Sequence, residues 1–532
     1  MALPVRMSRV SSLLLLLAIA FAGLALPARA SAGNRGRTLV ALEPRATCEA
    51  AATLAGAGAT LFDGDLGLWS IASDDASRVI TALRAGGALR YAEPVRTYAT
   101  AAVGAQPADP LSAGEWWRAQ IGVESVTPPG PGVPVTIVDS GVGFEHPEFA
   151  GRPNTIALNA QDPAPLGGRH GTSVASVIGA PANGLGIVGI YPEAVLRSWD
   201  TAPGLQNLDT TEIVNGILAA ARAGKGVINL SLGGSEPDSV IEDAVGEAVS
   251  RGSLIVAAAG NDGERGNPLE YPASLPHVLT VGATDRSGGV AGFSSTSVYI
   301  DLVAPGVEIP VAEVQSNGWQ TSQGTSFAAP LVSGAAAWVW TVRPELDALQ
   351  VAEVLRRSAR DLGAPGRDRL SGFGILNVAG ALAHPTPVRD KTEPNDDIDT
   401  VDPNRERFYG QQTAITTKSR QRTTFTATLD AYEDPRDVYR VWLPARSTVT
   451  MTVGSSTDND LVLFREGIPT IGGRLIADYR IARAQARGRT ERLTYANPGA
   501  GRFAYLAVTV PRGVVDATYR LTVGSRPTPR AH

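Results

Sequence analysis

The feature that most constrains this fold is the alternation of apolar strands with single amphipathic helices between Val133 and Leu382. Short, almost wholly apolar runs suit strands that are covered on both faces of a sheet. These runs are Val135–Val138, Val195–Trp199, Val227–Leu230, Leu254–Ala259 and Val278–Val281. Single helices between successive strands imply right-handed crossovers and parallel strands. The pattern predicts an α/β fold with a doubly wound parallel sheet, whose site lies beyond the carboxyl ends of the strands.

The chain of 532 residues is long enough for roughly two or three domains. The sequence pattern on either side of this region differs from the pattern within it. A small α+β pattern spans 38–98 and contains strands at Thr38–Leu42, Gly67–Ile71 and Leu89–Tyr91, with a helix at Ala76–Leu83. The composition then shifts to Ala, Pro and Asp around Ala99–Pro110, which predicts an exposed connection. Beyond a Pro-rich joint at 384–387, short runs rich in Thr, Val and Tyr predict a separate all-β sandwich.

The N-terminus has the pattern of a secretory signal peptide. Arg6 and Arg9 precede an apolar run from Val10 to Leu26, and small residues lead up to Ala30. We expect a signal peptide over residues 1–30, and therefore an extracellular or periplasmic protein that is not held in the membrane after cleavage. An uncleaved membrane anchor is the alternative, because the run is long enough to span a bilayer.

Composition limits the partners and the means of stabilisation. Lys and Arg total 47 against 52 Asp and Glu, a net charge of −5 without a basic block, which argues against a nucleic-acid partner. The only cysteine, Cys48, can form no internal disulfide. An exported chain of this kind depends on its core and on any bound ions.

Ser326 is the candidate nucleophile. It lies in Gly324–Pro330, and the small and apolar residues that follow predict a buried helix. Gly324 allows a sharp turn before that helix, and Thr325 or Ser326 is expected to cap its first turn. Pro330 falls early in the helix, where a missing N–H does least damage. A hydroxyl at the positive end of a buried helix suits a reaction that creates an oxyanion. An ordinary helix cap is the alternative when this stretch is considered alone.

A nucleophilic serine needs a base and a group that orients the base. Of the five histidines, His170 stands out because it opens a short apolar helix, and Asp139 ends the apolar strand at 135–138. Asn229 and Asn261 also end apolar strands, and a side-chain amide beside the nucleophile can donate to a tetrahedral intermediate. Taken singly these signals are weak, because a strand-end Asp is more often a turn residue and a lone His is more often a satisfied polar group.

Taken together, these segments resemble the subtilisin-like serine proteases over roughly 116–382. The matching segments, in the family's order, are Ile137–Val142, His170–Ala175, Val227–Gly234, Ala258–Asn261 and Gly324–Pro330. The resemblance implies a secreted endopeptidase that works through an acyl-enzyme and needs no cofactor for its chemistry. It assigns Ser326 as the nucleophile and His170 as the general base and acid. It assigns Asp139 to orient His170, and Asn261 with the N–H of Ser326 to the oxyanion hole.

The resemblance also implies how protein or peptide substrates are bound. Ser231, Leu232 and Gly233 would form an edge strand on which an extended peptide lies. With 257–260 they would wall the pocket for the side chain that precedes the scissile bond. Glu270 would lie near the base of that pocket and favour Lys or Arg, although a short preceding loop leaves a solvent-facing Glu270 as the alternative. Residues 206–208 depart from the family's Gly-rich strand, so recognition further upstream in the substrate stays open.

The flanking regions acquire roles through the same resemblance. Residues 31–105 would be a propeptide that is an intramolecular chaperone and inhibitor, removed by self-cleavage, and 106–384 the peptidase domain. After a linker at 385–392, residues 393–532 resemble the pre-peptidase C-terminal domain of secreted bacterial proteases. The marks of that domain are Glu393–Asp396, Asp437–Val441 and Asp458–Leu463.

Two expectations remain more open. Glu148 and Asn183, the latter in the loop 181–186, resemble the neighbourhood of a calcium-binding loop, and their oxygen atoms suit Ca²⁺. A plain surface turn is the alternative there. For the whole chain, the alternative is a catalytically dead peptide- or surface-binding relative, which is disfavoured because each catalytic position carries the residue type that catalysis needs.

Overall fold

The computed structural model describes residues 37–528, apart from 44–45, 47, 65, 96, 101–102, 108–113, 161–168, 203–207, 364, 403–412, 433, 469, 472–475, 511–513 and 515–516. The predicted signal peptide, residues 1–30, lies outside this range. Within the described residues, no helix is both long enough and apolar enough to span a bilayer.

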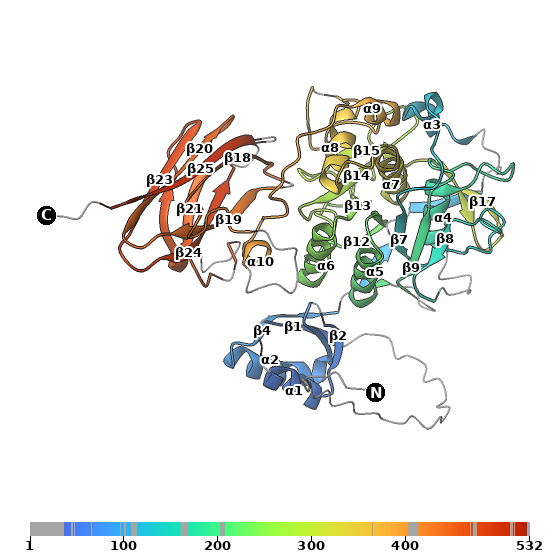
Figure 1. The fold of residues 1–532 in the computed structure, drawn as a ribbon. Coiled ribbons are helices and arrows are strands. Elements are labelled where there is room, and N and C mark those ends of the chain that lie inside the picture. The colour runs from blue at the N-terminus through green and yellow to red at the C-terminus, as the bar shows by residue number, and fades with distance from the viewer. Residues whose placement is uncertain are drawn as a thin grey trace, which may run out of the picture. The chain divides into compact units, whose positions relative to one another are not determined.

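A seven-stranded parallel sheet lies at the centre of the α/β region, with the strand order β15-β14-β13-β11-β7-β9-β8 (Figure 1). Its strands are β7 (Val135–Asp139), β8 (Thr155–Ala157), β9 (Leu196–Asp200), β11 (Val227–Leu230), β13 (Leu254–Ala258), β14 (Val278–Thr284) and β15 (Leu302–Pro305). The predicted doubly wound parallel sheet is therefore confirmed. The order of strands changes direction at β7, so a crevice is expected outside the carboxyl end of that strand.

Helices cover both faces of this sheet, because successive strand residues point to opposite sides. Side chains such as Ile137 and Val256 pack with α4 (Arg169–Gly179) and α7 (Thr325–Val342). Their neighbours Val138 and Ile255 pack with α5 (Thr210–Arg222) and α6 (Ser239–Ser250) on the other face. The remaining helices of this region are α3 (Trp117–Gln120), η2 (Val123–Ser125), α8 (Ala348–Ser358) and α9 (Val378–Ala383).

Helix α7 is the predicted buried helix, but its first turn is capped differently from the prediction. Neither Thr325 nor Ser326 caps it, since the helix begins at Thr325 after Gly324, whose φ is 147°. The amide oxygen of Asn261 accepts the N–H of Thr325 at 2.9 Å instead. Pro330 cannot donate to the carbonyl four residues earlier, and that carbonyl, of Ser326, accepts the hydroxyl of Ser231 at 2.9 Å. A tertiary contact thus replaces the hydrogen bond that the proline removes.

The N-terminal unit is the predicted α+β pattern. Its antiparallel sheet has the order β2-β3-β1-β4 and packs a shared core against α1 and α2. The elements are β1 (Arg37–Leu42), α1 (Cys48–Gly56), β2 (Thr60–Asp63), β3 (Leu68–Ala72), α2 (Ser73–Ala85) and β4 (Leu89–Pro94). Strand β2 and helix α1 were not predicted.

The segment that was expected to be an exposed connection contains paired strands. β5 (Thr97–Thr100) lies between β10 (Leu208–Asp209) and β12 (Leu232–Gly233) in a small antiparallel sheet. β6 (Val103–Pro107) pairs with β17 (Gly318–Gln323), which also pairs with β16 (Ile309–Glu313). Composition alone did not reveal this pairing because its partners come from distant parts of the chain.

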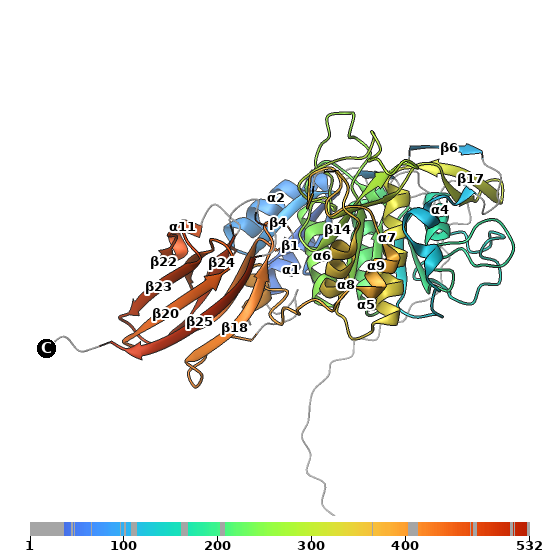
Figure 2. The ribbon, with the colours of Figure 1, turned by 90° about the horizontal axis from the view of Figure 1, so that it is seen from above.

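The C-terminal region is an all-β sandwich of two antiparallel sheets, ordered β18-β25-β20-β23 and β19-β24-β21-β22 (orange to red in Figures 1 and 2). Side chains from both sheets form one core. The elements are α10 (Ile398–Val401), β18 (Arg422–Leu429), β19 (Arg436–Leu443), β20 (Ser447–Ser455), β21 (Asp460–Arg465), α11 (Ile476–Tyr479), β22 (Arg480–Ala484), β23 (Thr490–Asn497), β24 (Arg502–Thr509) and β25 (Ala517–Pro527). β22 and β23 were missed because polar and arginine residues interrupt their apolar pattern.

Candidate active site

Asp139 and His170 form a hydrogen-bonded pair at the carboxyl end of β7. Asp139 is the last residue of that strand and is fully buried, and His170 lies in the first turn of α4. The imidazole Nδ1 lies 2.9 Å from each carboxylate oxygen. Among the described residues, the buried Nε2 atom has no hydrogen-bond partner. With Nδ1 donating to Asp139, Nε2 is the atom that can take up a proton.

A close backbone approach fixes this pair. A side chain at position 171 would bring a Cβ within 3.0 Å of the carbonyl carbon of Gly141 and 3.3 Å of the Cβ of Asp139. Only glycine fits at 171 without moving the backbone, which explains why His170 is followed by Gly171.

Ser326 lies at the N-terminus of α7 and is fully buried. Its hydroxyl donates to the carbonyl of Ser231 at 3.3 Å, and within the described part of the chain no hydrogen bond joins it to His170. The imidazole does lie against the next residue, Phe327, with the ring centroids 5.8 Å apart. Hydrogen bonds between reacting side chains often tighten only when substrate is bound, so this arrangement is compatible with a Ser326–His170 pair.

The structure distinguishes between the two candidate asparagines. Asn229 is engaged at both ends of its amide, since Nδ2 donates to Ser231 at 3.0 Å and Oδ1 accepts from Ser333 at 2.9 Å. Asn261 accepts from Thr325 through Oδ1, but its buried Nδ2 has no partner among the described residues. Asn261 is therefore the amide whose donor remains available, and Thr325 sets its orientation.

In the chain's own segment 97–107, strand β5 pairs with strands on both of its sides, and one of these adjoins Ser231, whose hydroxyl donates to the carbonyl of Ser326. Ala99 and Thr100 pair with Gly233 and Leu232 of β12, the strand that directly follows Ser231. On the other side of the same segment, Tyr98 pairs with Leu208. Residues 206–208 depart from the family's Gly-rich strand in sequence, but a short strand, β10, is present at Leu208–Asp209. A peptide can be held here on both sides by β-addition.

Downstream of residues 101–102, the same segment pairs with β17. Val103 lies opposite Gln323, which is three residues before Ser326. The segment therefore changes partner strand between Thr100 and Val103, from the β12 side to the β17 side.

Glu270 lies inward, between the two runs that the sequence assigned to the pocket walls. Its side chain is 8% exposed. A Cβ added at Gly233 would lie 3.2 Å from the Glu270 Oε2 atom, and one added at Gly260 would lie 2.9 Å from its carboxyl carbon. Burial, and to a smaller extent the charge of Asp262, raises the pKa of Glu270 to about 7.

The residues expected to bind calcium are engaged in other contacts. Glu148 is buried and accepts from Trp319 at 2.5 Å and from the N–H of Ile187 at 3.4 Å, all through Oε2. The other carboxylate oxygen of Glu148, Oε1, is buried and has no partner among the described residues. Burial raises the pKa of Glu148 to about 7. Asn183 is exposed, and its amide oxygen accepts the N–H of Leu185 at 2.8 Å. Calcium at Glu148 and Asn183 stays a prediction.

Comparisons with known proteins agree with this geometry. The model of the Subtilase family matches residues 130–374. Subtilisin Savinase from Lederbergia lenta is 34% identical over 252 residues, which is 47% of this chain and 91% of the relative. An alkaline protease from Alkalihalobacillus alcalophilus is 34% identical over 252 residues, 47% of this chain and 64% of the relative.

The fold is also found among solved structures. Fervidolysin from Fervidobacterium pennivorans, described as a keratinolytic enzyme related to subtilisin, superposes with a TM-score of 0.58. The match has 20% identity and covers 88% of this chain and 84% of the other, which establishes a shared fold.

Proposed function

The chain belongs to the subtilase family of serine endopeptidases, and we propose that it hydrolyses protein and peptide substrates through the triad Asp139, His170 and Ser326. The observation that carries the proposal is a pair of buried, unpartnered atoms beside the N-terminus of α7. Among the described residues, His170 Nε2 and Asn261 Nδ2 are buried without hydrogen-bond partners. A buried polar atom without a partner is costly, so each atom is expected to gain one during the reaction: Nε2 the hydroxyl of Ser326, and Nδ2 the oxygen of the substrate carbonyl.

The chemistry follows from these atoms. Rotation about the Cα–Cβ bond of Ser326 moves its hydroxyl from the carbonyl of Ser231 toward His170. Oγ then attacks the peptide carbonyl carbon while Nε2 of His170 takes the hydroxyl proton. Asp139 accepts from Nδ1–H and stabilises the imidazolium. Asn261 Nδ2 and the N–H of Ser326 donate to the oxyanion.

The attack forms a tetrahedral intermediate, which then breaks down. The carbon–nitrogen bond breaks, His170 gives its proton to the leaving amine, and an acyl-enzyme on Ser326 remains. Water attacks the ester with His170 again acting as the base, which releases the acid product and restores Ser326. Every proton in this cycle is carried by His170, so the chemistry requires no cofactor.

A serine-directed phosphonate and a casein-type substrate test this proposal against the catalytically dead alternative. The native chain should be labelled once and should degrade the substrate, whereas Ser326→Ala should do neither. Binding of peptide without labelling or hydrolysis by the native chain would support the dead relative.

We further propose that the first substrate is the chain itself, with residues 31–105 as its propeptide. The pairings of Thr100 with Leu232 and of Val103 with Gln323 support this, because Leu232 follows Ser231, which hydrogen-bonds to Ser326, and Gln323 lies three residues before Ser326. The residues between them, 101 and 102, lie outside the described range. Self-cleavage is therefore expected between Thr100 and Val103, slightly before the boundary of 105 that the sequence suggested.

Contacts of the N-terminal unit support the same role. Asp243 in α6 accepts hydrogen bonds from Arg90 and Tyr91, and Glu93 accepts from the hydroxyl of Ser239 at 2.6 Å. These contacts join β4 to the N-terminal turns of α6. A propeptide that folds against α6 and places its end at Ser326 would both assist folding and inhibit the enzyme.

We also propose a role for each region of the chain and for the residues that bind substrate. Residues 1–30 are the proposed signal peptide of a secreted protein, 106–384 the peptidase domain, 385–392 the linker and 393–532 a domain like the pre-peptidase C-terminal domain. Ser231, Leu232 and Gly233 bind the substrate backbone, and Glu270 selects Lys or Arg in the pocket before the scissile bond. Calcium at Glu148 and Asn183 would act on stability alone.

A further inference from the structure

One sheet face of the C-terminal sandwich carries hydroxyl groups and positive charge but no negative charge. Side chains alternate along the strands of the sheet β18-β25-β20-β23 (Figure 2), so one set packs in the core and the other points outward. The outward face consists of the even-numbered residues of 422–428, 518–526, 448–454 and 490–496. These positions hold only threonine, arginine, glycine and alanine, with threonine the most frequent.

The arginines of the outward face are Arg422, Arg492, Arg520 and Arg526. All four are exposed, and none forms an ion pair or hydrogen bond with another described residue. Arg422 and Arg492 lie on the two edge strands, which are three strand spacings apart, or about 14 Å. Charges spread in this way are matched by an extended polyanion and not by one small anion.

An open groove crosses the strands between these arginines. It has a volume of about 620 Å³, and Arg422, Arg492 and Arg526 line it. Thr450, Thr452 and Thr494 contribute the surface between them, and their hydroxyl groups have no hydrogen-bond partner among the described residues. A threonine hydroxyl can donate and accept at once, so the groove offers both kinds of partner to a ligand.

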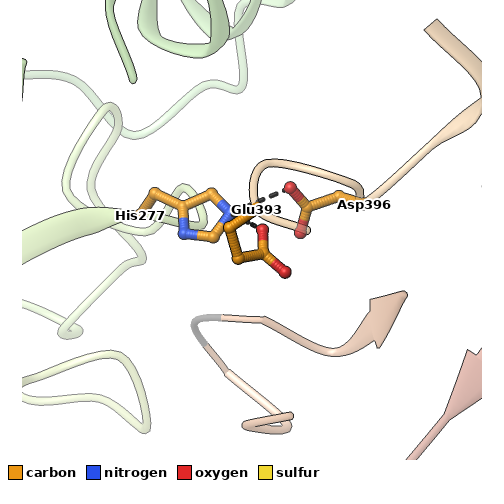
Figure 3. Close-up of side chains that lie close together, drawn as sticks. All are labelled: His277, Glu393 and Asp396. Atoms are coloured by element: carbon orange, nitrogen blue, oxygen red, sulfur yellow. Dashed lines mark hydrogen bonds and ion pairs between the residues drawn. The ribbon is translucent and has the colours of Figure 1, made fainter. Parts of the chain in front are cut away.

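Acidic side chains of the same domain are engaged elsewhere. Glu393 and Asp396 face His277, whose Nε2 atom lies 3.9 Å from the first and 2.8 Å from the second (Figure 3). Glu491 lies on β23 but is buried, and its carboxylate accepts the N–H of Ala486 at 2.9 Å. The outward face thus stays positive in a chain whose net charge is −5.

The residue types of the groove select among polyanions. Arginine binds carboxylate and sulfate groups with paired hydrogen bonds, and threonine hydroxyls suit the hydroxyl groups of a sugar. Single-stranded nucleic acids are held by stacking of bases on aromatic side chains, and this face has none. Peptides that bind to sheets add to a free edge or fill apolar pockets, whereas this groove runs across a polar face.

We propose that the outward face binds an acidic polysaccharide. Arg422 and Arg526 hold its acidic groups near one edge of the sheet and Arg492 near the other, while the threonines between them bind the sugar hydroxyls. This binding needs no part of the active site. If the proposed peptidase activity holds, the sandwich keeps the enzyme on a surface rich in acidic polysaccharide while the peptidase region cleaves proteins there.

The test uses the full chain as the Ser326→Ala variant, which prevents self-digestion, so the result does not depend on activity. Titration calorimetry measures binding of polygalacturonate, which carries carboxylates, and of dextran sulfate, with neutral dextran as the reference. At least one acidic polymer should bind, more weakly as salt rises, and dextran should not. Failure of both acidic polymers to bind, or equal binding of dextran, would refute the proposal.

Paired substitutions then locate the site. Arg422→Gln combined with Arg492→Gln should weaken binding roughly tenfold, because two charged hydrogen-bond donors are lost. Arg480→Gln combined with Arg483→Gln removes the same charge from exposed positions on β22 of the other sheet and is the matched control. An equal loss in both pairs would show that net charge alone attracts the polymer and would overturn the proposed site.

A further pair separates a polysaccharide from an acidic peptide. Thr452→Val combined with Thr494→Val keeps the shape of the groove and removes two hydroxyl groups. It should weaken binding of the acidic polysaccharide severalfold and leave binding of polyglutamate unchanged. Polyglutamate that binds as tightly as the polysaccharide, with no effect of the threonine pair on either, would assign the face to acidic peptides instead. Unchanged melting temperatures establish that each variant is folded.

Discussion

Replacement of Glu270 by Gln tests how the proposed pocket recognises its substrate. Gln has nearly the same shape and removes only the charge, so the pocket should keep its volume between Gly233 and Gly260. A Lys or Arg side chain that enters would meet a carboxylate that is 8% exposed. Hydrogen bonds to charged groups contribute about 1.5–3 kcal/mol. The substitution should therefore lower kcat/KM for basic substrates roughly ten- to hundredfold relative to apolar ones.

The same carboxylate predicts a pH dependence. Burial raises the pKa of Glu270 to about 7, so the free pocket carries its negative charge above that pH and is neutral below it. The preference for Lys or Arg over Phe or Leu should rise as the pH increases through about 7. At pH 5.5 the native enzyme should behave like Glu270→Gln.

The assay compares kcat/KM on peptides that differ only in the residue before the scissile bond, namely Arg, Lys, Phe or Leu, between pH 5.5 and 9. Glu264→Gln is the matched control, because Glu264 is an exposed carboxylate in the preceding loop. A basic-to-apolar ratio that is the same in native enzyme and Glu270→Gln, at every pH, would refute the placement of this carboxylate in the pocket.

Three further outcomes are expected. Ser326→Ala should abolish proteolysis and leave the propeptide attached, and N-terminal sequencing of the native product should find a start between 101 and 103; a variant that still matures in a purified refolding reaction would contradict intramolecular cleavage. Asn261→Ala should keep the fold and lose roughly 10²–10³ in kcat with little change in KM, because its bond strengthens only in the transition state, whereas a dominant effect on KM would reassign Asn261 to substrate binding. If calcium binds at Glu148, chelator should speed thermal inactivation, and Glu148→Gln should remove that effect; indifference to chelator would count against calcium at Glu148.

The central sheet could be predicted because its signal is local. Each apolar run, such as 227–230 or 254–258, shows burial on both faces without reference to any other part of the chain. The strand ends then placed Asp139 and Asn261 at one edge of the sheet, and the small residues after Ser326 indicated a buried helix. Weaker local signals were missed, as in β22, where arginines interrupt the apolar pattern.

Contacts between distant residues were decided only by the tertiary structure. Asn229 and Asn261 have the same local context, but one meets Ser231 and Ser333 while the other meets Thr325, 64 residues away, through its oxygen alone. The inward position of Glu270 depends on glycines in two other segments. β5 found its partners in β10 and β12, although its composition suggested an exposed connection.

The amino-acid sequence by itself determined which residue types end the strands and begin the helices, because burial and backbone preference act over neighbouring residues. It did not determine which hydrogen-bonding atoms remain unpartnered after folding. That depends on pairs such as Ser231 and Ser326, which lie 95 residues apart and meet only when the sheet and α7 pack together. His170 Nε2 and Asn261 Nδ2 lack hydrogen-bond partners among the described residues because of this packing. Whether a polar atom has a partner is decided by the folded positions of all the residues around it.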